Sequence, residues 1–92
     1  MNLWWRFDSR NRLRAFAKSK ARTDTGMVRY GVDIEVTSIR DGWLYACQGH
    51  DNYLNTSNVR SGHGTSLEAV LDKCGQEARE MLAAYGGEAS KD

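Results

Sequence analysis

The chain of 92 residues contains no proline, and only two of its residues are cysteine. Proline often marks the boundary between domains, so its absence removes one common sign of a boundary, and no internal repeat is present either. A chain of this length is expected to form one domain. We assign residues 1–87 to a single domain and expect residues 88–92 to form a short disordered tail. Cys47 and Cys74 both lie in segments with periodic apolar residues, where two reduced, buried thiols are expected rather than a disulfide.

Long apolar runs are also missing from the chain. No stretch approaches the roughly 18 consecutive apolar residues that a membrane span requires. The N-terminus does not have the pattern of a signal peptide, because Arg6 and Asp8 interrupt it before an apolar run develops. We therefore expect a cytoplasmic protein without membrane contact.

A long helix is predicted near the C-terminus, from about residue 66 to residue 85. Thr65 and Glu68 have the spacing of a capping box, and Gly86-Gly87 supplies a C-terminal stop. Between these signals the apolar residues recur at steps of three and four, as on one face of an α-helix. This stripe consists of Leu67, Val70, Leu71, Cys74, Ala78, Met81, Leu82 and Tyr85.

A β-hairpin is predicted in the middle of the chain. Residues 28–37 alternate between apolar and polar, which is the pattern of a half-buried strand. Asp41-Gly42 favours a two-residue type I′ turn, and this turn would pair Ile39 with Leu44. The face of the hairpin directed at the core then consists of Val32, Ile34, Val36, Tyr45 and Cys47.

The remaining segments complete the predicted fold. Residues 49–64 are dense in turn-forming residues and predict a long loop, which is a second candidate contact surface. Near the N-terminus two interpretations stay open: strands over residues 3–7 and 12–20, or a helix over residues 10–21. Strict alternation favours the strands, although the residue types are good helix formers. The predicted fold class is α+β, with a small antiparallel sheet of three or four strands packed against one long C-terminal helix.

Charge is distributed unevenly within the net charge of +1. Residues 1–30 carry eight basic and two acidic side chains, whereas residues 31–92 carry five basic and ten acidic ones. Every basic residue between positions 6 and 22 occupies an even position, so an extended chain would direct them all to one face. Cations interleaved with aromatic residues suit a polyanion or an acidic protein surface. The predicted binding residues are Arg6, Arg10, Arg12, Arg14, Lys18, Lys20, Arg22, Trp4 and Phe16.

No pattern in the sequence predicts catalysis. Cys47, His50, His63 and Cys74 can be written as a four-ligand zinc set, but both cysteines belong to predicted core segments. A Cys–His nucleophile pair would require the same residues to meet in a cleft beside a third orienting group. We expect no metal, no cofactor, no small-molecule substrate and no enzymatic activity.

The helix start contains Thr65, Glu68 and Ala69 in the order Thr-x-x-Glu-Ala, with Val70 following. The run from Asp41-Gly42-Trp43 to this helix start resembles HicB-like antitoxins. In that family a strand, a turn and a second strand lead to a Thr-x-x-Glu-Ala-Leu helix that packs on the sheet. The Gly-Cys-x-x-x-Gly segment of that family is not reproduced. This resemblance implies an alternative function as an antitoxin or a small regulatory nucleic-acid-binding protein, with a toxin as its partner.

As a whole, the short chain with polarised charge and no catalytic pattern resembles small phage-encoded anti-CRISPR proteins, such as those of the type I-F group. These are single α+β domains that bind a Cas effector complex. The resemblance implies an inhibitor that acts in the host cytoplasm by engaging a CRISPR–Cas surveillance complex, including its guide RNA. Many such inhibitors present an acidic face, whereas the basic face here implies contact with guide RNA or with an acidic Cas surface.

Overall fold

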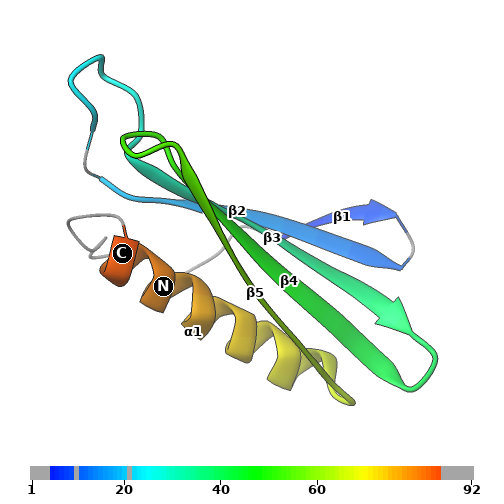
Figure 1. The fold of residues 1–92 in the computed structure, drawn as a ribbon. Coiled ribbons are helices and arrows are strands. Elements are labelled where there is room, and N and C mark those ends of the chain that lie inside the picture. The colour runs from blue at the N-terminus through cyan, green and yellow to red at the C-terminus, as the bar shows by residue number, and fades with distance from the viewer. Residues whose placement is uncertain (1–4, 10, 21, 86–92) are drawn as a thin grey trace.

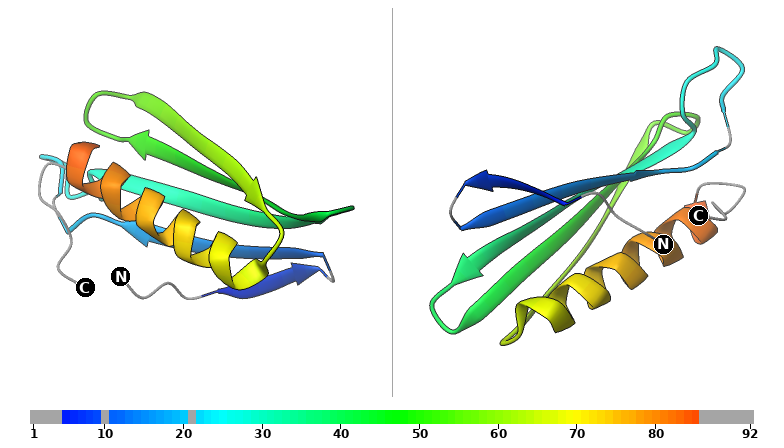
Figure 2. Two further views of the ribbon diagram at one scale, coloured as in Figure 1. Left: turned by 90° about the horizontal axis from the view of Figure 1, so that it is seen from below. Right: turned by 180° about the vertical axis from the view of Figure 1, so that it is seen from behind.

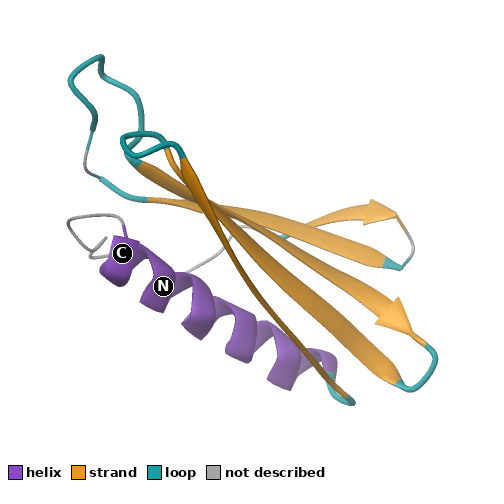
Figure 3. Ribbon diagram, viewed as in Figure 1, coloured by secondary structure: helices purple, strands orange, loops and turns teal. Residues whose placement is uncertain are grey.

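The computed structural model describes residues 5–9, 11–20 and 22–85. Five strands form one sheet in the order β1-β2-β3-β4-β5, and each strand is antiparallel to its neighbours (Figure 1). A single helix, α1, follows the last strand (Figure 3). The elements are β1 (Arg6–Ser9), β2 (Arg12–Lys18), β3 (Tyr30–Ile39), β4 (Gly42–Asp51), β5 (Thr56–Gly64) and α1 (Leu67–Tyr85).

The core lies between α1 and one face of the sheet (Figure 2). Alternate residues of β2, β3 and β4 are buried, and α1 contributes Val70, Cys74, Ala78, Met81 and Leu82. The predicted stripe and the predicted hairpin face therefore meet, and the α+β fold with a C-terminal helix on an antiparallel sheet is confirmed. The strands contribute Leu13, Ala15, Ala17, Tyr30, Val32, Ile34, Val36, Tyr45 and Cys47.

The choice between strand and helix near the N-terminus, which the sequence left open, is decided by the structure. Residues 12–18 form a strand and not a helix, because β2 alternates strictly between exposed and buried residues. Trp4, Arg10 and the predicted tail at residues 88–92 lie outside the residues that the structure describes.

The prediction of a long loop over residues 49–64 is wrong. β4 continues to Asp51, and β5 pairs with it in an unbroken register from Thr56 to Gly64. Only the connection between them is a turn, in which the Asp51 carboxylate accepts hydrogen bonds from the backbone N–H groups of Tyr53 and Leu54 at 2.8 and 3.0 Å. Serine, asparagine and glycine have low strand propensity, but pairing with a neighbouring strand overrides it. The sheet consequently has one strand more than the predicted maximum of four.

The predicted register of the β3–β4 hairpin is wrong by two residues. Ile39 pairs with Gly42 rather than with Leu44, so the turn residues are Arg40 and Asp41. Neither turn residue has a positive φ, whereas Gly42 has a φ of 149°. A side chain at Gly42 would collide with the carbonyl oxygen of Gly64. The glycine is therefore required for close approach to β5, and the two-residue shift keeps the predicted core face because the side-chain period is two.

The helix cap also differs from the prediction. The Ser66 hydroxyl accepts a hydrogen bond from the backbone N–H of Ala69 at 3.3 Å. Because α1 begins at Leu67, Ser66 occupies the N-cap position, and the residue three positions later is Ala69 rather than Glu68. The predicted pairing of Thr65 with Glu68 is therefore replaced by a cap from Ser66 alone.

Two isoleucines of β3 provide a matched test of this core. Ile34 is 1% exposed, whereas Ile39, near the end of the same strand, is 42% exposed. Ile34→Ala is expected to lower the free energy of unfolding by about 2–5 kcal/mol, because it removes buried apolar area and leaves a cavity. Ile39→Ala is expected to lower it by less than about 1 kcal/mol. Urea denaturation of both variants measures the difference, and equal losses would contradict the assigned core.

Candidate binding surface

The face of the sheet opposite α1 is the candidate binding surface, and we call it the open face. Residues paired directly across antiparallel strands point to the same side of a sheet. Arg14, Glu35, Ala46 and Ser61 are successive partners across four strands, and none of them is buried. Figure 2 shows that α1 lies along the other side of the sheet.

The predicted cationic residues gather on the open face at the β1–β2 border. Arg12, Arg14 and Lys18 of β2 are exposed. Arg6 of β1 is exposed as well and is the register partner of Arg14. Side chains that the sequence separates by eight positions are thus brought together by strand pairing.

Acidic residues of β3 lie directly beside these cations. Glu35 pairs in register with Arg14, and its carboxylate lies 3.4 Å from Nε of Arg12. Asp33 pairs in register with Phe16 and is exposed. Both side chains of the Arg12–Glu35 ion pair are a little under half exposed, so water screens the pair and it contributes about 0–1 kcal/mol to stability. We call the cations of β1 and β2 the basic border (Arg6, Arg12, Arg14 and Lys18) and the carboxylates of β3 the acidic row (Asp33 and Glu35). The two lie side by side because of the strand register, which the sequence alone does not give.

Phe16 belongs to the surface and not to the core. Its side chain is 54% exposed on the open face. The ring rests over Gly31, where an added Cβ would come within 2.8 Å of the ring carbon Cζ. The tip of the ring therefore lies against the backbone of β3, and the exposed side chain remains available for contact with a planar group.

Lys20 and Arg22 lie beyond the end of β2, in the connection to β3. Arg22 forms an isolated bridge with Val28, and the backbone N–H of Thr23 donates to the carbonyl of Met27 at 2.8 Å. This connection projects from the end of the sheet in Figure 1. Both cations are exposed, so they extend the basic border past the sheet rather than along it.

The β4–β5 turn supports the base of this projection. Asn52 donates a side-chain hydrogen bond to the carbonyl of Val28 at 2.7 Å, and its backbone N–H donates to the carbonyl of Arg29 at 2.8 Å. The guanidinium carbon of Arg29 lies 5.3 Å from the centroid of the Tyr53 ring, within the range of a cation–π interaction. Tyr53 and Leu54 are each 61% exposed, so this end of the sheet presents apolar groups beside cations.

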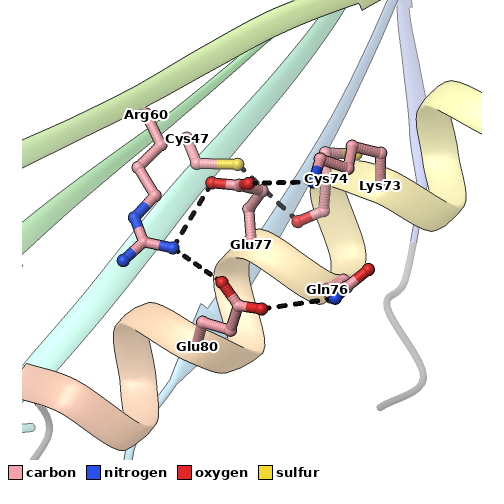
Figure 4. Close-up of polar contacts among 7 residues, drawn as sticks. All are labelled: Cys47, Arg60, Lys73, Cys74, Gln76, Glu77 and Glu80. Atoms are coloured by element: carbon pink, nitrogen blue, oxygen red, sulfur yellow. Dashed lines mark hydrogen bonds and ion pairs between the residues drawn. The ribbon is translucent and has the colours of Figure 1, made fainter.

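The possible zinc ligands are divided between the core and the open face. Cys47 of β4 and Cys74 of α1 are buried between the sheet and the helix, whereas His50 and His63 are exposed on the open face. Within the described ranges, no group of three or more histidine, cysteine, aspartate or glutamate side chains is placed to hold a metal ion. The Cys47 thiol donates to the carbonyl of Cys74 at 3.7 Å (Figure 4). Burial raises the pKa of Cys47 to about 12 and that of Cys74 to about 11.

Arg60 was not identified from the sequence, yet it holds the edge of the sheet to the helix. It projects from β5 on the side of α1, and its Nη1 lies 2.9 Å from Glu80 and 3.4 Å from Glu77 (Figure 4). The hydrogen bond with Glu80 raises the pKa of Arg60. Lys73 lies 3.4 Å from the other oxygen of Glu77. The sequence singles out Arg60 only as the one charged residue of this segment and does not indicate its partners on α1.

No family model, curated protein or solved structure matches this chain. In the part of the chain that the structure describes, no helix combines the length and the apolar character needed to cross a membrane.

The raised pKa values predict unreactive thiols in the folded protein. The thiolate is the reactive form, and a pKa of about 11 leaves roughly one Cys74 thiol in a thousand ionised at pH 8. Ellman's reagent at pH 8 is expected to react very slowly with the native protein and to titrate both cysteines in guanidinium chloride. Rapid reaction of either thiol in the native protein would contradict the burial of this pair.

Proposed function

We propose that this chain is a non-catalytic binding protein that engages a ribonucleoprotein through the basic border of its open face. The observation that carries the proposal is the cluster formed by Arg6, Arg12, Arg14 and Lys18 with the exposed Phe16 ring. Four cations on adjacent strands next to an exposed aromatic ring match the two requirements of single-stranded nucleic acid: phosphate contacts and a side chain on which a base can stack.

The acidic row on β3 limits how a polyanion would lie on this face. Asp33 and Glu35 repel phosphates, so a bound strand follows β1 and β2 rather than crossing the sheet. The exposed Lys20 and Arg22 continue the same line beyond the sheet. A single RNA strand held in a protein complex fits this narrow line of cations better than a nucleic-acid duplex does.

The test uses a fluorescein-labelled oligouridine and fluorescence anisotropy over a series of salt concentrations. Arg14→Glu combined with Lys18→Glu is expected to weaken binding by more than about tenfold at low salt. Each phosphate contact releases counterions from the nucleic acid, and this favourable contribution to binding is lost with the contact. The slope of log K against log salt is expected to become shallower by about 1.4, or about 0.7 for each of the two contacts.

A matched control reverses two cations elsewhere. Arg40 lies in the β3–β4 turn and Arg79 on α1, and both are exposed. Arg40→Glu combined with Arg79→Glu changes the net charge by the same amount and is expected to leave affinity within about twofold. Equal losses in both double variants would show that only net charge matters and would contradict the assigned border.

Inhibition of a CRISPR–Cas effector complex is the specific form of this proposal that the likeness to anti-CRISPR proteins suggests. A protein bound along exposed guide RNA or on the adjacent Cas surface would block pairing with target DNA. Target binding by a purified type I-F surveillance complex is expected to fall when the wild-type protein is added and to recover with the Arg14→Glu, Lys18→Glu variant. Inhibition that persists with this variant would assign contact to another surface.

A further inference from the structure

The two edges of the sheet differ in how they are protected. β1 is four residues long, and its register with β2 shifts between Phe7 and Ser9. β5 is nine residues long, and its register with β4 runs without a shift. Natural sheets protect edges with short strands, bulges, charged side chains or proline, because an open edge can pair with a strand of another chain. β1 has two of these devices. β5 contains no lysine, no proline and no bulge, and its one charged side chain, Arg60, is neutralised by Glu77 and Glu80 of α1.

The outer side of β5 is open in the structure. β5 is the last strand of the sheet, and among the described residues no strand lies beside it (Figure 2). None of its nine residues is buried, even on the side of α1, whereas β2, β3 and β4 each bury alternate residues. Its backbone N–H and C=O groups on that side are therefore available for a further strand.

We propose that β5 pairs antiparallel with β5 of a second copy of this chain, with Val59 at the centre of the pairing. An antiparallel strand pair has a two-fold axis perpendicular to the sheet, so one surface serves as its own complement. Val59 is 64% exposed, more than any other large hydrophobic residue among those described. Pairing at this residue places the two Val59 side chains against each other on the open face, so each covers part of the apolar surface of the other.

The charges on β5 fit a second copy in this register. Arg60 is the sole charged residue of the strand, and Glu77 and Glu80 of its own chain already neutralise it. With Val59 at the centre, Arg60 lies opposite Asn58 of the second copy, and Ser57 lies opposite Ser61. A register centred on Arg60 would instead bring two guanidinium groups together, which is unfavourable.

The first test measures mass by light scattering over a range of protein concentrations. The wild-type protein is expected to move from 10.4 kDa towards twice that mass as its concentration rises. Val59→Lys is expected to remain a monomer at every concentration. Leu44→Lys provides the matched control, because Leu44 is 44% exposed on the same face but lies on β4, and it is expected to associate like the wild type. A wild type that stays monomeric, or a Val59→Lys variant that dimerises, would overturn the proposal.

The second test determines the register by cross-linking. Val59→Cys is expected to form an intermolecular disulfide under mild oxidation, because directly opposed residues have Cβ atoms about 4.5–5.5 Å apart. Ser61→Cys is the control: Ser61 is exposed on the same face, but its counterpart in the second copy lies four residues, or roughly 13 Å, along the strand. Cys47 and Cys74 are buried and do not compete. Faster cross-linking of Ser61→Cys would overturn the Val59-centred pairing.

Discussion

The burial of one sheet face under a single helix is the interaction on which the rest of the structure depends. Cys74 and Ala78 are fully buried at the centre of α1, and their small side chains allow the helix to approach the strands closely. Beside them Tyr30 and Tyr45 lie over glycines of neighbouring strands, where an added Cβ would collide with the rings. One helix covers one face only, so the opposite face must be compatible with water, and any large partner meets the sheet there or at an edge.

The alternation in β2 and the apolar stripe of α1 could be predicted because each is a local consequence of burying one face. The register of β3 and β4 could not, because Gly42 serves a contact with Gly64 of β5, a strand that local propensity did not reveal. β5 itself lacks the apolar alternation of a core strand, since its side towards α1 holds polar residues and glycines. Its position comes from backbone pairing with β4, which composition does not encode.

The same distinction holds for the candidate site: features within one strand could be predicted, whereas features that depend on strand pairing could not. The shared face of Arg12, Arg14, Phe16 and Lys18 follows from parity alone and was predictable. The acidic row beside them was not, because parity alone leaves the pairing of β2 with β3 undetermined. The same limit applies to Arg60, whose carboxylate partners lie 17 and 20 residues away on a different element. Charge along the chain therefore predicted the presence of a basic surface but not its width.

The two edges of the sheet suit different partners for one electrostatic reason. A border that carries Arg6, Arg12, Arg14 and Lys18 attracts a polyanion and repels its own copy, because like charges across a two-fold axis face each other. The β5 edge has its one charge compensated internally, so pairing with its own copy carries no such penalty. In the proposed dimer both helices lie on one side and the open faces form one surface of ten strands, five from each copy. The two basic borders then lie at opposite ends of the dimer. A polyanion long enough to reach both would bind the second border at a high effective concentration once it is bound to the first, so it would bind more tightly than a short one.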